Sequence, residues 1–395
     1  MKKLIPYGQH YLDKADRKAV DKVLRSNSIT QGPLIEKFEK KIAKYVNSKY
    51  AVAVSSCTAG MHLSLLACGI NKNKKVLTSP ITFVSTANVI KFCNAKVDFI
   101  DIDKKTLNIS LDILKKNFLD KNKKIDAIIP VHFAGNAVDT KKLKKILNKN
   151  TYIIEDGAHA LGSRYKDGTM VGSCKFADVT VFSLHPVKTI ACGEGGIITT
   201  NNKDLYIKLL RLRSHGINKL DDKFLNKKNA FTDKKINPWY YEMQELGYHY
   251  RLTEIQAALG ISQMNKINKF LNKRKKIAKI YTAYFLKKSN QINFETANHF
   301  DIKLSSNHLF VIKLDIDKII KSRAQIMNEL KEKGILTQVH YIPVPTHPYY
   351  SKEKKFSNIS NALKYYNSCL SVPIYYTLSV NEQKFVINQL ENIIK

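Results

Sequence analysis

Short apolar runs alternate with amphipathic segments through the first two hundred residues of the chain. The amphipathic segments predict helices near residues 14–26, 34–46, 59–67, 85–93, 111–118 and 140–148. The apolar runs predict strands at 50–54, 76–80, 96–101, 127–133, 151–156, 177–184 and 195–200. Strands that are apolar throughout are usually buried on both faces. The pattern therefore predicts an α/β fold with a mostly parallel sheet covered by helices.

The pattern changes after residue 265. A long lysine-rich helix is followed by an expected strand at 308–314, a helix at 322–334, a strand at 336–344 and a final helix opened by the capping residues Ser379 and Glu382. We expect a large domain at 1–265 and a smaller α+β domain at 266–395. The polar segment 217–245 fits either a flap over a ligand or a subunit contact.

Lys188 stands apart from the other basic residues. The chain has 66 lysines and arginines, yet Lys188 is the only one between Phe176 and Asn202. It lies between two apolar runs, and desolvation makes a lysine a better amine nucleophile. A loop lysine that extends to solvent is the alternative interpretation.

A carboxylate ends a neighbouring strand. Asp156 closes the run 151–156, and His159 follows three residues later. A lysine and a strand-end carboxylate suit pyridoxal phosphate, because the carboxylate keeps the pyridine nitrogen protonated while the ring accepts electrons. Lys188 would hold the cofactor covalently and then carry a proton. These two residues are the predicted catalytic pair.

The strand 50–54 leads into Ser56, Cys57, Thr58 and a helix. The N–H groups and positive dipole of a helix start can hold a phosphate, although serine and threonine are also ordinary helix caps. Ligands bind beyond the carboxyl ends of parallel strands. This rule predicts one crevice lined by Ser56, Phe83, His132, Asp156 and Ser183. For His132 a structural role is favoured.

Seven motifs together resemble the DegT/DnrJ/EryC1/StrS sugar aminotransferases. They are SSCTAGMHLSLLACG, SPITFVSTANVIKFCNAKVDFIDID, IPVHFAGN, EDGAHALG, FSLHPVKTIACGEGG, LGYHYRLTEIQAALGISQM and VHYIPV. The resemblance implies the fold type I architecture of pyridoxal-phosphate-dependent transferases. It places Phe83 against the pyridine ring, His159 at the phenolic oxygen and Ser183 at the phosphate. Cys57 replaces a small residue, and His249 replaces an asparagine that reaches the phosphate bound by the neighbouring subunit.

The resemblance also implies a set of substrate contacts. They are Tyr7, Thr30, Gln31, Gly32, Ser56, Arg251, His340 and Tyr341. From local sequence alone, the turn at 30–32 could equally be a turn without a further role. Pro345 replaces a histidine frequent in similar proteins.

Within the family, NPWYYEMQELGYHYR and SPITFVSTAN are most similar to the branch that makes the 4-amino sugar precursor of pseudaminic acid. This implies a homodimer that moves an amino group from L-glutamate to C4 of UDP-2-acetamido-2,6-dideoxy-β-L-arabino-hex-4-ulose. The alternatives are the D-xylo sugar, which leads to bacillosamine or legionaminic acid, and another nucleotide-linked 4-keto sugar. Sugar dehydratases of this fold have histidine where Lys188 stands.

Composition changes this interpretation little. The formal net charge is +33, but the lysines are dispersed and lack interleaved aromatic residues, so we expect neither nucleic acid nor membrane as a partner. The six cysteines form no CxxC pair, and no metal-ligand spacing occurs. No stretch is typical of a signal peptide or a membrane span, so we expect a cytoplasmic protein. A nucleic-acid binder and a cofactor-binding regulator are the non-enzymatic alternatives.

Overall fold

The computed structural model describes residues 4–219, 223–289, 291–353 and 356–394. Its centre is a seven-stranded sheet of order β1-β7-β6-β5-β4-β2-β3, in which only β7 runs antiparallel to its neighbours. The strands are β1 (Tyr50–Val54), β2 (Lys75–Thr78), β3 (Lys96–Phe99), β4 (Ala127–Ile129), β5 (Tyr152–Asp156), β6 (Val179–Ser183) and β7 (Gly196–Thr200). The mostly parallel sheet predicted from the apolar runs is confirmed.

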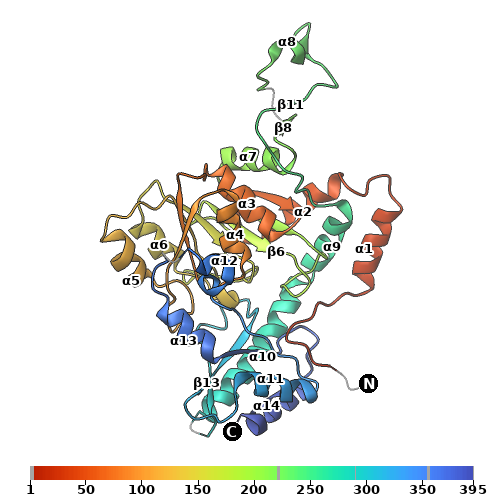
Figure 1. Ribbon diagram of the computed structural model, residues 1–395. Helices are drawn as coiled ribbons and strands as arrows, with labels where there is room; N and C mark the ends of the chain where they lie inside the picture. The colour runs from red at the N-terminus through yellow and green to blue at the C-terminus, as the bar shows by residue number, and fades with distance from the viewer. Residues whose placement is uncertain (1–3, 220–222, 290, 354–355, 395) are drawn as a thin grey trace.

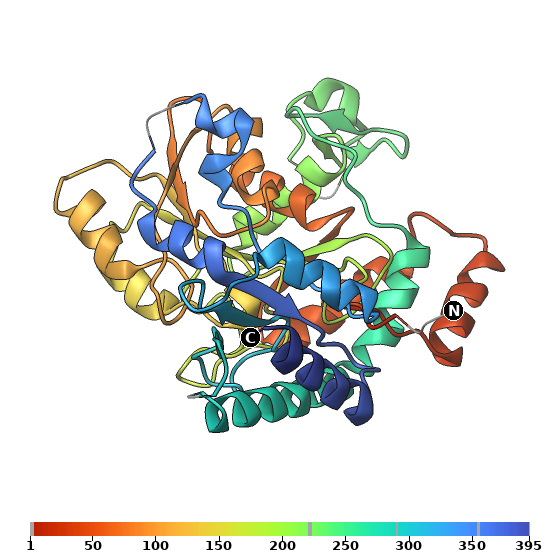
Figure 2. The ribbon, with the colours of Figure 1, turned by 60° about the horizontal axis from the view of Figure 1, so that its bottom comes forward.

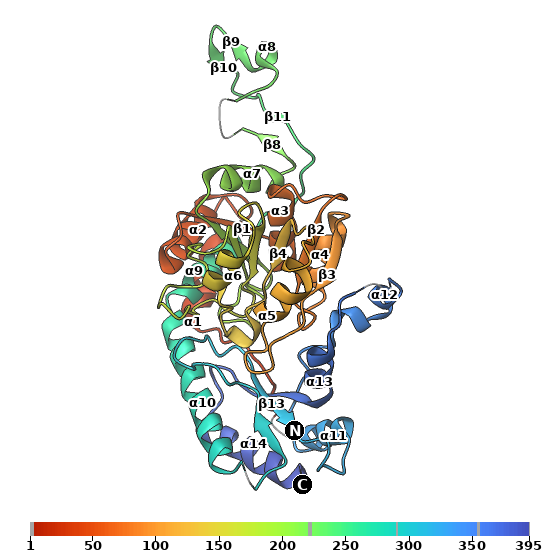
Figure 3. The ribbon, with the colours of Figure 1, turned by 90° about the vertical axis from the view of Figure 1, so that its left-hand side faces the viewer.

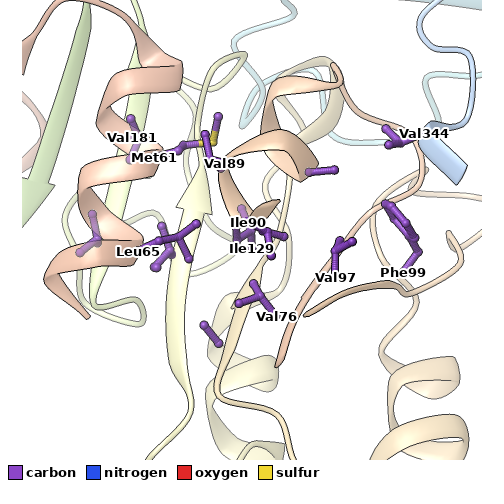
Figure 4. Close-up of a cluster of buried hydrophobic side chains, with 14 of the residues drawn as sticks. Met61, Leu65, Val76, Val89, Ile90, Val97, Phe99, Ile129, Val181 and Val344 are labelled. Atoms are coloured by element: carbon purple, nitrogen blue, oxygen red, sulfur yellow. The ribbon is translucent and has the colours of Figure 1, made fainter. Parts of the chain in front are cut away.

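Helices cover both faces of this sheet (Figures 1 and 3). One face packs against α3 (Cys57–Ala67), α4 (Ser85–Phe92) and α7 (Lys203–Arg213). Met61 and Leu65 from α3 and Val89 and Ile90 from α4 pack into this core (Figure 4). The other face packs against α2 (Pro33–Val46), α5 (Leu111–Leu114), η1 (Lys115–Leu119), α6 (Thr140–Ile146) and α9 (Glu254–Met264). Both faces are thereby kept from water, as continuously apolar strands require.

Further helical segments complete the large part of the molecule. The helix α1 (Lys14–Leu24) lies against α9, and η2 (Phe133–Gly135) is a short turn that follows β4. Among the described residues, no helix has both the length and the apolar character that crossing a bilayer requires.

A second, antiparallel sheet of order β12-β13-β14 begins beyond the helix α10 (Ile267–Lys287). Its strands are β12 (Phe294–Thr296), β13 (Phe310–Leu314) and β14 (Cys369–Val372), accompanied by α11 (Arg323–Glu332), η3 (Val344–Thr346), α12 (Pro348–Ser351), α13 (Ser360–Ser368) and α14 (Val380–Ile393). The first turns of α10 pack into the large core, and the later turns pack on this sheet. We therefore propose the domain boundary at residues 265 and 266, with Ile5 joining the second domain.

The second domain also reaches back onto the first. The Tyr350 hydroxyl donates to the Asn88 side-chain oxygen (2.7 Å), and the Val344 N–H donates to the Pro80 carbonyl (2.9 Å). In Figure 2 the blue C-terminal ribbon lies beside the orange ribbon of the large domain. The second domain thus contacts the large domain at the segment that follows β2 and at α4.

The strand expected at 336–344 is wrong. Only Gln338 pairs with the sheet there, through a single bridge to Ser371. Pro343 and Pro345 lack the N–H groups that a ladder needs. The backbone instead turns and directs His340 and Tyr341 to a cavity between the domains.

A thin arm projects from the body (Figures 1 and 3). It contains β8 (Ile217–Asn218), α8 (Lys227–Ala230), β9 (Phe231–Thr232), β10 (Lys235–Ile236) and β11 (Glu242–Met243), each a single turn or a two-residue strand. Trp239 on this arm is 73% exposed. The polar segment expected at 217–245 therefore stands away from the cavity of its own chain.

Candidate active site

The carboxyl ends of the parallel strands and two segments of the second domain enclose a cavity of about 740 Å³. Eleven of the residues predicted from the sequence line it: Tyr7, Ser56, Cys57, Thr58, Phe83, Asp156, His159, Ser183, Lys188, His340 and Tyr341. They come from segments that are far apart in the sequence. The strand-end rule applied to the sequence predicts that such side chains lie together, and the structure brings these eleven residues to one cavity.

Lys188 lies on the loop between β6 and β7. Its backbone N–H donates to the His185 carbonyl (2.9 Å), which fixes the turn, and its side chain borders the cavity. Desolvation by burial lowers the pKa of the Lys188 amine to about 8, while the negative charge of Asp156 acts in the opposite direction. Part of the population therefore carries an uncharged, nucleophilic amine near neutral pH.

Asp156 ends β5, and its carboxylate is held from two sides. The Thr86 hydroxyl donates to Oδ2 (2.7 Å), and the Ala158 N–H donates to Oδ1 (3.0 Å). The side chain is buried and lines the cavity. A carboxylate fixed in this way can accept a proton or a hydrogen bond from a ligand without first reorganising.

The neighbouring Glu155 faces the opposite side of the sheet, as alternation along a strand requires. Its buried carboxylate accepts hydrogen bonds from the hydroxyls of Thr140, Tyr165 and Thr180. His132 is also buried: its Nδ1 accepts the Val138 N–H (2.9 Å), and its Nε2 lies 3.3 Å from Glu155. His132 does not line the cavity. The prediction that His132 lines the crevice is therefore wrong, because its ring lies against Glu155 instead, and we propose a structural role for it.

The turn from β1 into α3 forms an anion cradle. The first N–H groups of α3 have no acceptor within the helix, and the Ser56 side chain caps the helix by accepting the Ala59 N–H (3.0 Å). The start of β7 lies against this turn, so that a Cβ on Gly196 would come within 2.5 Å of the Ser56 carbonyl oxygen. The hydroxyls of Thr58 and Ser183 border the same space. Burial raises the pKa of the Cys57 thiol well above its usual value, so this side chain is uncharged.

His159 joins the two domains. Its Nδ1 accepts the Ala134 N–H (3.3 Å), so Nε2 carries the proton and lies 3.1 Å from the Tyr341 hydroxyl. The His308 ring lies against that of His159, with the ring centroids 4.4 Å apart and the planes tilted by 35°. Burial keeps the pKa of His159 well below its usual value, and the charge of Lys188 acts in the same direction. The ring is therefore a neutral hydrogen-bond donor.

His340 completes the second-domain side of the cavity. Its Nδ1 lies 2.9 Å from the Ser371 hydroxyl, and its ring is 5.3 Å from that of Tyr7. Burial, assisted by the charge of Lys188, lowers the pKa of His340 to about 3. Like His159, it is a neutral group beside a potential substrate.

These side chains fit pyridoxal phosphate. A nucleophilic amine and a fixed carboxylate share one cavity, and a helix N-terminus with hydroxyls borders it. Phe83 is 59% exposed although it lies at the cavity wall, so its ring can cover an aromatic ligand. Among the described residues, no group of three or more histidine, cysteine or carboxylate side chains could hold a metal ion.

Five predicted residues do not line this cavity. Thr30, Gln31 and Gly32 form the turn between α1 and α2, which lies on the start of α9: the Thr30 carbonyl accepts the Glu254 N–H (3.1 Å). His249 pairs with Ser214, and Arg251 pairs with Val54. The bridge to Val54 places the Arg251 backbone two residues from Ser56, but none of the five residues lines the cavity, so their roles stay predictions.

Sequence reasoning missed two groups that support the site. Thr86 orients Asp156, and its position at the start of a helix near Phe83 is the signal that could have indicated it. His308 lines the cavity and its ring packs against that of His159. His308 precedes an ordinary apolar strand, and nothing in that local pattern distinguishes it from a structural residue.

Comparison with known proteins agrees with this geometry. The sequence profile of the DegT/DnrJ/EryC1/StrS aminotransferase family matches residues 10–391. The UDP-4-amino-4,6-dideoxy-N-acetyl-beta-L-altrosamine transaminase of Campylobacter jejuni subsp. jejuni serotype O:23/36 (strain 81-176) is 37% identical over 99% of this chain and 98% of its own length.

Two solved structures are also similar. Helicobacter pylori PseC, an aminotransferase involved in the biosynthesis of pseudoaminic acid, has a TM-score of 0.87 and 30% identity, and the match covers 99% of each chain. The pyridoxal phosphate form of a sugar aminotransferase from Streptococcus pneumoniae has a TM-score of 0.86 and 26% identity, with coverage of 99% of this chain and 98% of that one.

Proposed function

Because this chain belongs to the DegT/DnrJ/EryC1/StrS aminotransferase family and is a pyridoxal-phosphate-dependent sugar aminotransferase, we propose that it aminates C4 of a UDP-linked 4-keto-6-deoxy sugar. The observation that carries this proposal is the meeting of Lys188 and Asp156 in one cavity. The amine is a nucleophile and base, and the carboxylate is its fixed counterpart. A binding protein without a reaction would need neither.

The residues divide the chemistry as follows. When bound, pyridoxal phosphate accepts the electron pair released as a substrate C–H bond breaks. Asp156 would keep the pyridine nitrogen protonated, and His159 would donate from Nε2 to the phenolic oxygen. Lys188 would hold the cofactor covalently, give way to the amino donor and then carry the proton between carbon atoms as a general base. Ser56, Thr58 and Ser183 would bind the phosphate.

For the substrates, we propose L-glutamate as amino donor and UDP-2-acetamido-2,6-dideoxy-β-L-arabino-hex-4-ulose as acceptor. The product would be UDP-4-amino-4,6-dideoxy-N-acetyl-β-L-altrosamine, a precursor of pseudaminic acid. The similarity to the Campylobacter jejuni transaminase over nearly the full chain supports this choice. Tyr7, His340 and Tyr341 would face the sugar from the second-domain side, since all three line the cavity.

The enzyme would work as a homodimer. The arm carries exposed apolar side chains, and five of the predicted site residues do not line the cavity of their own chain. Among the described residues, the buried Arg251 Nε has no hydrogen-bond partner. A second subunit would cover the arm and would let His249, Arg251 and the 30–32 turn complete the neighbouring cavity.

All six cysteines are unpaired. Free thiols suit a reducing compartment, which supports the cytoplasm as the place where the enzyme acts.

The decisive experiment separates the sugar epimers. Enzyme is converted to its pyridoxamine form with L-glutamate, freed of donor, and mixed separately with the L-arabino and D-xylo UDP-4-keto sugars. The return of the visible absorbance of the bound cofactor is the readout. Return with the L-arabino sugar alone supports the proposal, and return with the D-xylo sugar alone assigns the enzyme to the alternative substrate. Return with neither refutes both sugars.

A further inference from the structure

Arg274 is a buried cation without a carboxylate partner. It lies on α10 and is 3% exposed, and its Nη1 donates to the backbone carbonyls of His308 (3.1 Å) and Ile374 (2.9 Å). None of the ion pairs found among the described residues includes Arg274. An unpaired buried charge is costly, and an apolar side chain would usually stabilise such a position better. The charge itself therefore calls for an explanation.

The position of Arg274 relative to Lys188 supplies one. A small cavity of about 10 Å³, enough for roughly one water molecule, is bordered by both side chains. Arg274 does not line the large cavity, whereas Lys188 borders both. The guanidinium charge thus acts on the amine from outside the space that the substrate and cofactor would occupy.

The groups around Lys188 have opposing effects. Asp156 on β5 favours the protonated amine, and Arg274 on α10 opposes it, while the Cys57 thiol on α3 is uncharged. His159, His308 and His340 are kept neutral, because burial and the charge of Lys188 lower the pKa of each. Among these groups, Arg274 is the permanent positive charge. Asp156 has to stay because the cofactor would need it. Another charge must therefore counteract the effect of Asp156 on the protonation of Lys188.

We propose that Arg274 is a positioning residue whose unpaired guanidinium, placed behind Lys188, favours the uncharged amine that the reaction needs. This inference rests on the role proposed for Lys188 as nucleophile and base. The two carbonyl acceptors hold the guanidinium in place without neutralising it. One of these bonds ties the His308 backbone to α10, and the His308 ring packs against that of His159.

The test measures the protonation of Lys188 directly, without turnover. Full-length, cofactor-free enzyme is labelled with acetic anhydride over a range of pH, because this reagent acetylates only uncharged amines. Lys188 is the only lysine or arginine between Lys175 and Lys203, so its acetylation joins two tryptic peptides into one that spans 176–203. Mass spectrometry of the joined and separate peptides gives the labelled fraction. Lys124, whose side chain is 78% exposed, serves as the internal reference.

In the wild-type enzyme we expect a labelling midpoint near pH 8. In Arg274→Gln the midpoint should rise by about half a pH unit, which is about threefold less labelling at pH 7. Arg274→Lys keeps the charge and should leave the midpoint in place. In the plot of rate against pH for the pyridoxamine half-reaction, the acidic limb should shift by the same amount as the labelling midpoint. An unchanged labelling midpoint in folded Arg274→Gln overturns the inference, even where activity falls. A residue with only a structural role would lower activity without shifting the labelling midpoint.

A second variant covers the case in which Arg274→Gln does not fold. Gln9 is exposed and borders the same small cavity, so Gln9→Glu adds a negative charge there at almost unchanged volume. The midpoint should move in the same direction by a smaller amount, and no movement contradicts the inference. Labelling requires no sugar substrate. The protonation of Lys188 can therefore still be measured if the enzyme does not accept the proposed sugar.

Discussion

The cavity floor and the projecting arm are built in opposite ways. The floor consists of strand ends and helix starts, from β1, β5 and β6, whose side chains are fixed by the buried sheet behind them. The arm consists of two-residue strands and a single helical turn. Strands this short are not stable alone. The floor therefore has its geometry within one chain, whereas the arm would depend on the second subunit proposed above.

Exposure of side chains shows the same difference. Asp156 and His159 are polar yet buried, and each has defined hydrogen-bond partners. The arm exposes a group of large apolar side chains: Leu225, Trp239, Tyr241, Met243 and Leu246. Such a group on one projecting segment is typical of an interaction site. Changes in the floor should therefore affect chemistry within a subunit, and changes in the arm should affect assembly first.

The largest effect is expected from Lys188→Ala. Loss of the amine removes both the covalent attachment and the proton carrier, so turnover should fall by roughly three orders of magnitude or more, with the dimer intact. Glutamate-dependent transamination and sedimentation would be measured together. Lys175→Ala, which removes an exposed lysine nearby, should leave both unchanged. Substantial turnover by Lys188→Ala would refute the assignment of the cavity floor as the catalytic site.

Asp156→Asn should have the next largest effect. The amide keeps the size of the side chain but cannot hold the ring nitrogen protonated, so turnover should fall on the order of a hundredfold or more while cofactor stays bound. Single-turnover kinetics measure the rate of the reaction, and the absorbance of bound cofactor measures how much cofactor the variant retains. Asp167→Asn, at an exposed turn, is the matched control. A normal rate in Asp156→Asn would contradict the role of this carboxylate.

A smaller and different effect is expected from Trp239→Ser in the arm. Loss of a large apolar contact should weaken the dimer by roughly tenfold to a hundredfold in dissociation constant, measured by analytical ultracentrifugation. Turnover per subunit should fall only at protein concentrations where the dimer dissociates. Ile320→Ser removes a side chain that is 98% exposed outside the arm, and it should change neither quantity. Equal dimer stability in both variants would remove the distinction between arm and floor.

The sequence predicted the floor because strand-end residues follow a local rule. An apolar run, its end and the next polar residue are adjacent in the chain, so Asp156, Ser183 and Ser56 could be placed at one edge of the sheet without coordinates. The capping pair at Ser379 and Glu382 was local in the same sense, and the structure confirms it.

Long-range features could not be predicted in this way. The alternation at 336–344 is typical of a strand, but packing between the domains turns this backbone toward the cavity. Arg274 belongs to a run of basic residues that resembles a solvated helix face, and only the tertiary structure shows that its side chain is buried. The 30–32 turn is positioned by its contact with the start of α9, more than two hundred residues away in the sequence, which a local pattern does not describe.

The contact between α9 and α2 limits how this enzyme could be re-engineered. The Glu254 carboxylate accepts the N–H groups of Leu34 (3.0 Å) and Ile35 (2.9 Å), and a Cβ on Gly32 would lie 2.8 Å from that carboxylate. A mutant library intended to change sugar preference can therefore randomise Thr30 and Gln31 freely. It should keep Gly32 and Glu254 unchanged. Their contact holds the start of α2 in place, and the position of the randomised loop depends on the start of α2.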